Sequence, residues 1–200
     1  MQLSRTLLSL SLPALFALSA QEPRPSCDHC SASYVSAAEL KAYLDRAPAR
    51  AVATGVADQQ VRAVDIGRSN VDVGVVYRGK LAAADAAKSP VAEHDLVSEV
   101  YHVIDGDATL VTGPDIVGAE RRPATNNNVR NLNGPGSNGT SIRKGATYHL
   151  KAGDVIVIPA GVGHWFTQID DHIRYLIIRV DPDKVTPLKD EAASKSDLAH

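Results

Sequence analysis

Three residues of metal-binding type occur in two short segments of the chain. His94 precedes Glu99 by five residues, and His164 follows a buried-strand pattern at 153–158 and a turn rich in Pro and Gly. Two imidazoles and one carboxylate form a facial donor set for divalent ions, with positions left open for O₂, water or a chelating substrate. His164 is therefore interpreted as a metal ligand, and the segment with His94 and Glu99 supports a metal-binding site.

Two further histidines compete for a place in this site. His102 follows Glu99 by three residues, and an odd separation in a regular strand sends two side chains to opposite faces, so His102 is expected to point outward. His149 lies four residues before the second segment and either approaches the site or ends a strand. Both stay alternative ligands. The other histidines are expected in solvent: His29, His172 and His200.

Short strands are the elements that must position these residues. Polar and apolar residues alternate with a period of two at 71–77, and Asp105-Gly106 is a pair typical of a tight type I′ hairpin. Strands are predicted at 61–66, 71–77, 99–104, 108–112, 146–151, 154–158, 164–169 and 173–180. Many short strands separated by Gly and Pro indicate an all-β antiparallel sandwich or barrel.

Two motifs can be written from these segments, G-x5-P-x-G-x2-H-x3-[N/Q] at 153–168 and H-x4-E-x6-G at 94–106. They resemble the two motifs of the cupin superfamily, and the chain is similar to its single-domain, cupin_2-like barrel proteins. The resemblance implies a jelly-roll barrel over residues 59–181 and a divalent metal held by three histidines and a glutamate. Ala92 stands where the first of these histidines is expected, so one ligand of the usual four is missing.

A substrate pocket is predicted beside the metal site. Side chains two residues apart on a strand share a face, which aligns Tyr101 with Glu99 and Phe166 with His164. The predicted lining is Tyr101, Val103, Phe166 and Gln168. Tyr101 is the one candidate catalytic residue, through a hydrogen bond to substrate or to metal-bound water, although a buried tyrosine is more often part of a core. Trp165 then points away and is expected to pack between sheets or at a dimer interface.

The segment 113–143 is rich in Asn and Gly and poor in apolar residues. A connection of this length is either a lid over a site or disordered. Its basic residues Arg130, Arg143 and Lys144 are candidates for contacting an anionic substrate, or are simply solvated.

The N-terminal region carries a different set of signals. Residues 1–20 have the pattern of a secretory signal peptide, with an apolar stretch too short to span a bilayer, so the mature protein is predicted to be periplasmic or extracellular and without a membrane anchor. Residues 21–58 contain one short helix, predicted at 36–47 from a capping box and ended by Pro48. Cys27 and Cys30 are expected to form a local disulfide, with a redox pair or a zinc half-site as alternatives. Residues 182–200 are predicted to be a polar tail on the surface.

The charge balance limits the choice of partner. The chain has 21 basic and 23 acidic residues, a net charge of −2, and no long run of either sign. This argues against nucleic acid and favours a small-molecule ligand. Unpaired sheet edges suggest a homodimer.

The predicted function is that of an exported metal-binding protein, an oxygenase or isomerase acting on a small chelating substrate. The alternative is a non-catalytic binding barrel. Iron or manganese is the preferred metal, with zinc, nickel or copper as alternatives.

Overall fold

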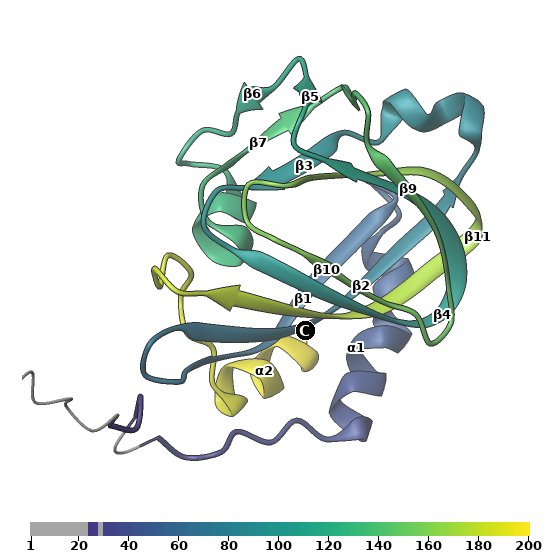
Figure 1. Ribbon diagram of the computed structural model, residues 1–200. Helices are drawn as coiled ribbons and strands as arrows, with labels where there is room; N and C mark the ends of the chain where they lie inside the picture. The colour runs from purple at the N-terminus through teal and green to yellow at the C-terminus, as the bar shows by residue number, and fades with distance from the viewer. Residues whose placement is uncertain (1–23, 28–29) are drawn as a thin grey trace, which may run out of the picture.

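Two long strands run side by side through the whole molecule, β4 (Ser98–Gly113) and β11 (Gly163–Asp181) (Figure 1). The computed structural model describes residues 24–27 and 30–200, and within it these strands pair antiparallel from Ser98–Val180 to Gly113–Gly163. The predicted signal peptide lies outside the described residues. Because both strands bend, each contributes to two facing halves of a barrel.

The bend in β4 lies at Gly106, where the sequence predicts a hairpin. That prediction is wrong, because β4 continues and keeps β11 as its partner on both sides of the bend. Gly106 has a φ of 77°, and a Cβ at this position would lie 2.0 Å from the carbonyl oxygen of His172. The glycine therefore permits a bulge within one strand rather than a reversal between two.

The remaining strands extend both halves of the barrel. One half contains β1 (Val56–Asp65), β2 (Asn70–Leu81) and β10 (Val155–Ile158), and the other contains β9 (Ala146–Lys151), β3 (Val91–His94), β7 (Gly136–Gly139) and β6 (Glu120–Arg121). Together with β4 and β11 they form a nine-stranded antiparallel sheet that folds over into the two facing halves. This confirms the predicted jelly-roll barrel with a short N-terminal helix.

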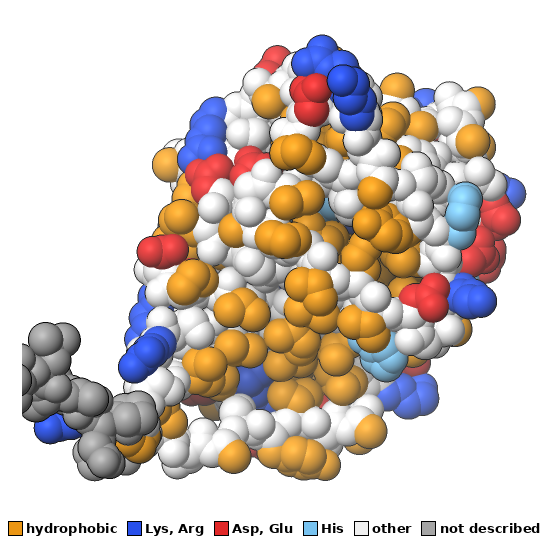
Figure 2. Space-filling model, viewed as in Figure 1, with side chains coloured by type: hydrophobic (Ala, Val, Ile, Leu, Met, Phe, Trp, Pro, Cys, Tyr) orange, Lys and Arg blue, Asp and Glu red, His pale blue; other side chains and the backbone are white. Residues whose placement is uncertain are grey.

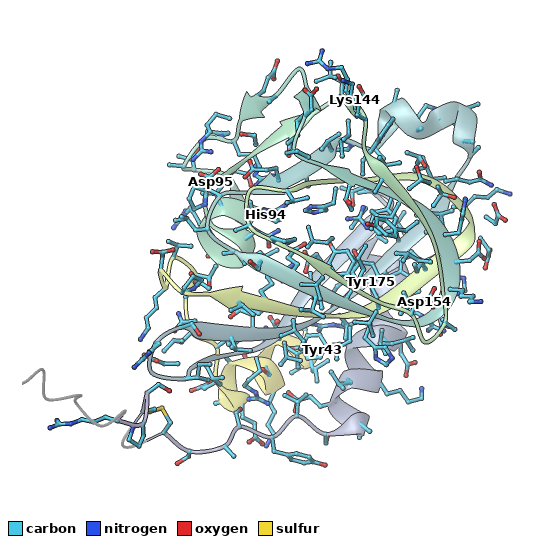
Figure 3. The ribbon with its side chains drawn as sticks, in the orientation of Figure 1. Tyr43, His94, Asp95, Lys144, Asp154 and Tyr175 are labelled. Atoms are coloured by element: carbon cyan, nitrogen blue, oxygen red, sulfur yellow. A yellow bond between two sulfur atoms is a disulfide. The ribbon has the colours of Figure 1, made fainter. Side chains whose placement is uncertain are left out.

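Alternation of side chains along the strands fills the barrel. Tyr101 and Val103 of β4, and Tyr175 and Ile177 of β11, point inward and join one apolar cluster. Figure 3 shows His94 and Tyr175 inside the barrel, whereas Tyr43 lies outside it. The apolar core therefore gives way to buried polar side chains around His94.

Helix α1 (Ala37–Arg50) covers the outside of the β1–β2 sheet. It begins as predicted, with the backbone N–H of Glu39 donating to Ser36 Oγ at 3.1 Å. It continues three residues beyond the predicted end at 47, because Pro48 is accommodated inside it. Tyr43 packs on Val61 and Val75, and Val76, the next residue along β2, faces the barrel interior.

The C-terminal segment, predicted to be a surface tail, is part of the fold. Lys189 forms a backbone bridge with Ala63, and helix α2 (Glu191–Leu198) follows. Ser194 is fully buried and Leu198 packs against the Tyr43 cluster. A small polar residue and a single backbone bridge leave no periodic signal, so the sequence pattern missed this packing.

The segment 113–143, predicted to be a lid or disordered, is built of short ordered elements. It contains β5 (Ile116–Val117) and β8 (Ser141–Ile142), which pair with each other, and the single π-helical turn η2 (Val129–Asn133). A 3₁₀ turn, η1 (Ala83–Lys88), precedes β3. Across residues 24–27 and 30–200, no helix has the length and hydropathy needed to span a membrane.

Hydrophobic side chains also lie on the outside of the barrel. Figure 2 shows them over the middle of one face, with most charged side chains around its rim. Val155 and Val157 of β10 are each 62% exposed, and β10 pairs with β4 alone. At the N-terminal end, Cys27 and Cys30 form a disulfide, with Cα atoms 5.7 Å apart.

Candidate metal centre

The structure brings together the three residues predicted to bind a metal. His94 ends β3, Glu99 is the second residue of β4, and His164 is the second residue of β11. Pairing of β11 with both other strands places them in one corner of the barrel interior. Their side chains are 4%, 2% and 4% exposed.

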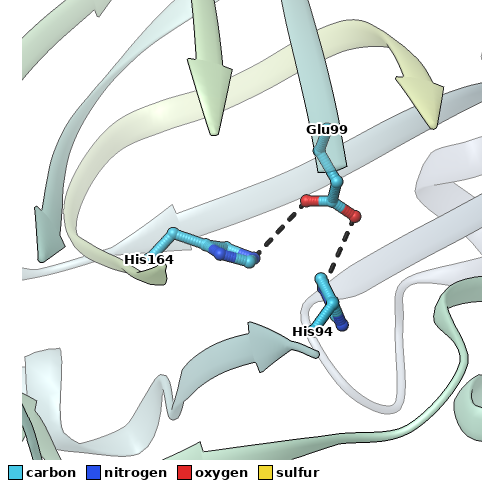
Figure 4. Close-up of side chains that lie close together, drawn as sticks. All are labelled: His94, Glu99 and His164. Atoms are coloured by element: carbon cyan, nitrogen blue, oxygen red, sulfur yellow. Dashed lines mark ion pairs between the residues drawn. The ribbon is translucent and has the colours of Figure 1, made fainter. Parts of the chain in front are cut away.

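The donor atoms converge around the Glu99 carboxylate (Figure 4). His94 Nε2 lies 3.4 Å from Oε1, and His164 Nε2 lies 3.5 Å from Oε2. All three donor atoms lie within 4.8 Å of one another. This cluster could hold a metal ion, and the assignment of its residues as ligands stays a prediction.

Two more side chains hold the carboxylate in place. Tyr101 Oη donates a hydrogen bond of 2.6 Å to Glu99 Oε2, and Arg179 Nε lies 3.3 Å from Oε1. Arg179 also donates to Asp58 and is fully buried. No motif in the sequence marks Arg179; the signal that could have found it is strand alternation, which puts it on the same face as Ile177.

The protonation states of Glu99, His94 and His164 suit a bound metal ion. Burial alone would raise the pKa of Glu99, but His94, His164, Arg179 and the Tyr101 hydroxyl lower it to about 2. Burial lowers the pKa of His94 to about 3 and also lowers the pKa of His164. At neutral pH both rings are therefore neutral, and Arg179 and Tyr101 keep the carboxylate ionised. Neutral imidazole and ionised carboxylate are the forms that bind metals.

The two histidines differ in tautomer. His164 Nδ1 lies 3.3 Å from the carbonyl oxygen of Val162, so Nδ1 carries the proton and the Nε2 lone pair faces Glu99. His94 Nδ1 lies 3.0 Å from Arg122 Nη2, and a guanidinium can only donate. Nδ1 of His94 therefore accepts, and its Nε2 carries the proton.

The donor set fits a divalent ion on one condition. His94 must lose its Nε2 proton before it can act as a ligand. The proton can move to Nδ1 if Arg122 gives up its hydrogen bond there. Arg122 keeps other acceptors, because it also donates to Ser137 O at 3.1 Å and to Asn138 Oδ1 at 3.0 Å. Arg122 comes from the segment 113–143, where no periodicity in the sequence indicated a role.

A cavity of about 470 Å³ opens beside these residues. Its charged lining is predominantly basic, with five cationic side chains against two acidic ones: Arg78, Lys80, Lys88, Arg122 and Arg179 against Asp58 and Glu99. Arg78 lies 4.3 Å above the Phe166 ring and donates to Tyr175 Oη at 3.1 Å. The positive balance favours an anionic occupant.

Of the predicted pocket residues, Tyr101 lines this cavity. Val103 and Phe166 instead pack in the hydrophobic core. Gln168 is exposed and donates to Asp170 at 2.7 Å, because the register of β11 shifts between Phe166 and Gln168. The bulge turns Gln168 outward, so simple alternation failed at this point.

The other predicted residues lie outside the cluster. His102 and His149 are exposed, and the His149 ring contacts Thr109 Oγ1 at 3.2 Å. Of the basic loop residues, Arg143 pairs with Asp115, and Arg130 and Lys144 are exposed.

Trp165 and His172 make contacts that the sequence did not predict. Trp165 Nε1 donates to the carbonyl oxygen of Ser89, next to η1, and its place between sheets or at a dimer interface stays a prediction. His172, predicted to be solvated, stacks on Tyr77 and pairs with Asp105 and Asp171.

Residues 138–197 match the family described as the AraC-like ligand binding domain, which has a cupin-like fold. The match supports the resemblance to the cupin superfamily, and the cupin_2-like subgroup stays a prediction. No curated protein sequence matches the chain significantly.

Several solved structures are similar in fold. The DMSP lyase DddQ from Ruegeria pomeroyi DSS-3 is 16% identical with a TM-score of 0.40, over 68% of this chain and 51% of that one. A Bacillus halodurans protein is 14% identical with a TM-score of 0.42, over 84% and 98%. A recombinant oxalate oxidase is 15% identical with a TM-score of 0.36, over 65% and 53%. The chain thus spans about half of the first structure, and its fold assignment rests on its own strand order.

Proposed function

We propose that this protein is a metal-dependent barrel that binds one divalent ion through His94, Glu99 and His164 and takes a small chelating anion beside it. The observation that carries the proposal is the convergence of the His94 and His164 imidazoles on the buried carboxylate of Glu99. Iron(II) or manganese(II) suits a set of two nitrogens and one carboxylate. The match to a ligand-binding family over 138–197 supports the small-molecule partner.

Arg78 is the residue we assign to the anion. It lines the cavity, and none of the ion pairs found among residues 24–27 and 30–200 includes it. Its guanidinium is held in place by the Phe166 ring and by the Tyr175 hydroxyl. A guanidinium held in this way can bind a carboxylate through two parallel hydrogen bonds.

The reaction class we propose is that of an oxygenase or isomerase. The bound ion would supply Lewis acidity toward an oxygen of the substrate. Arg78 would orient the anion, and the apolar wall formed by Ile169 and Ile177 would exclude water from it. Tyr101 holds Glu99, and burial raises its own pKa well above 10, so it acts as a positioning residue.

A non-catalytic binding barrel is the second candidate. The observation that favours it is that the Tyr101 hydroxyl, the group singled out for catalysis, is committed to Glu99. Turnover of a chelating 2-oxo or 2-hydroxy acid, followed by O₂ consumption and product analysis, separates the two candidates. Saturable binding without product would select the binding barrel.

The metal site is tested by elemental analysis of protein purified without chelators or affinity metals. We expect about one iron or manganese per chain in the wild type, and its loss in Glu99→Gln and His164→Ala. His102→Ala is the matched control, because it removes an exposed histidine from the same strand as Glu99. A wild type that takes up no metal on anaerobic reconstitution with iron(II) or manganese(II) would overturn the proposal.

Export and pairing remain proposals of the same kind. The signal-peptide pattern at 1–20 supports export, and detection of a mature chain starting at Gln21 outside the cytoplasm tests it. The exposed Val155 and Val157 on the edge strand β10 support a homodimer. We expect Val155→Lys to leave a monomer in sedimentation experiments.

A further inference from the structure

Asn133 is a buried amide beside the metal-binding cluster. It ends the turn η2, is 7% exposed, and lines the same cavity as His94 and Glu99. Its Nδ2 lies 3.0 Å from His94 Nε2, while its Oδ1 is buried with no hydrogen-bond partner among the described residues. A buried carbonyl oxygen without a partner costs about 1–3 kcal/mol.

The contact with His94 determines which way the amide faces. Arg122 occupies Nδ1 of His94 as a donor, so Nε2 carries the proton when no metal is bound. An amide N–H₂ facing this N–H would place two donors against each other. Rotating the amide by half a turn, which exchanges the near-equivalent O and N positions, puts Oδ1 against the His94 proton. The rotated amide removes the clash and gives Oδ1 a partner, while Nδ2 takes the buried position that Oδ1 held.

In this orientation Asn133 Oδ1 lies beside His94 Nε2, one of the donor atoms that converge on Glu99. Two donors at right angles on an ion with bonds of about 2.1 Å are about 3 Å apart. The Asn133–His94 contact is 3.0 Å, and the contacts from Glu99 to His94 and His164 are 3.4 and 3.5 Å. The amide oxygen is therefore spaced from His94 Nε2 as two ligands of one ion would be.

On β3, the residue two positions before His94 supplies no ligand. Ala92 lines the cavity and pairs with His164 across β3 and β11, but its methyl group offers no donor. Asn133 reaches the same cavity from the segment 113–143.

We propose that Asn133 Oδ1 is a fourth ligand of the metal ion, supplied by the segment 113–143. This inference rests on the proposed function, because it requires the ion at His94, Glu99 and His164. A carbonyl oxygen favours harder ions such as manganese(II) over softer ones. With four donors from the protein, a six-coordinate ion has two positions left, which suits an anion that chelates through two atoms.

The test is a titration of chelator-treated, full-length protein with manganese(II), followed by the electron paramagnetic resonance signal of the free ion. We expect Asn133→Leu to weaken binding by at least about tenfold, the lower end of what removing one supporting group at a metal site costs. Asn133→Asp should bind manganese(II) as tightly as the wild type or more tightly, because it keeps the oxygen. Asn128→Leu is the matched control, being an exposed asparagine that lines the same cavity, and should bind as the wild type does.

The aspartate variant separates a ligand from a structural amide. If Asn133 only donates its N–H₂ to His94, both variants lose that donor, and weaker binding in Asn133→Asp than in the wild type overturns the inference. Unchanged binding in Asn133→Leu would also overturn it while leaving the proposed function intact, provided that Glu99→Gln loses the ion. A wild type that binds no manganese(II) and no iron(II) overturns both. Thermal unfolding of each metal-free variant shows that the fold is retained, and Asn133→Asp serves as the test if Asn133→Leu does not fold.

Discussion

Glu99 and Asp72 are both buried carboxylates in the barrel walls, yet their surroundings shift their pKa values in opposite directions. Around Glu99 the histidines, Arg179 and Tyr101 outweigh burial and lower the pKa to about 2. Around Asp72 burial dominates and raises the pKa to about 6. Asp72 accepts from the Gln60 amide at 2.9 Å and from the Thr186 hydroxyl at 3.5 Å, and its Oδ1 has no partner in the described structure.

The opposite pKa shifts of Glu99 and Asp72 follow from the kinds of partner that each carboxylate has. Neutral donors, such as those at Asp72, satisfy a carboxylate without making its charge stable. A buried guanidinium and a short phenol hydrogen bond, as at Glu99, keep the charge and fix the position of the oxygens. A carboxylate held ionised away from water is ready to bind a cation, whereas Asp72 is part of the framework and lowers stability when it ionises.

Arg179→Met is expected to have the largest effect on stability, because it removes the cation that distinguishes Glu99 from Asp72. The substitution leaves Glu99 and Asp58 without their buried cation, and removing one partner of a buried pair typically costs about 3–5 kcal/mol. We expect urea unfolding to show a loss of this size. Arg143→Met, which removes an exposed ion pair with Asp115, should leave the urea midpoint unchanged. Equal effects in the two variants would contradict the role assigned to Arg179.

Asp72→Asn is expected to raise the stability of the fold, whereas Arg179→Met lowers it. The folded protein holds the Asp72 proton up to a pKa of about 6, above the 3.8 of an aspartate in water. Folding therefore binds a proton between these values, and the wild type loses stability as the pH rises through this window. Two pKa units correspond to at most about 3 kcal/mol.

The measurement is the free energy of unfolding of both proteins from pH 4 to pH 7. The variant should be the more stable protein at pH 7, and its advantage should shrink toward pH 4. A difference that does not change with pH would show that Asp72 is ionised in the folded protein throughout this range.

Tyr101→Phe should have the smallest effect of the three. It removes one hydrogen bond to a charged acceptor, which contributes about 1.5–3 kcal/mol. Because this bond orients Glu99, we also expect metal affinity to fall by about tenfold. Tyr175→Phe is the control, since its hydroxyl accepts from Arg78 and does not contact Glu99. Equal metal affinities in the two variants would exclude a positioning role for Tyr101.

The sequence predicted the parts of the site that follow from motif spacing and strand alternation. His94, Glu99 and His164 meet as expected, and Tyr101 faces the cavity because it lies two residues from Glu99. Alternation failed at Gln168, where a bulge shifts the register of β11. A bulge depends on how two distant strands pair, and neither strand encodes that alone.

The sequence missed contributions from segments without a period. Arg122 and Asn133 reach His94 from the region between 113 and 143, where tertiary contacts rather than local pattern fix the backbone. Gly106 was recognised as a residue of special backbone conformation, but a positive φ serves a bulge as well as a turn. Distinguishing the two requires knowledge of the partner strand.

The central position of β11 has a consequence for the order in which the molecule can form. β11 pairs with β2, β3 and β4, and it is the last strand along the chain. During synthesis the earlier strands therefore emerge without the partner that joins them, and the contacts that close the barrel span most of the sequence. A nascent chain would expose apolar strand faces until residue 181 has left the ribosome, a period in which a chaperone has most to offer.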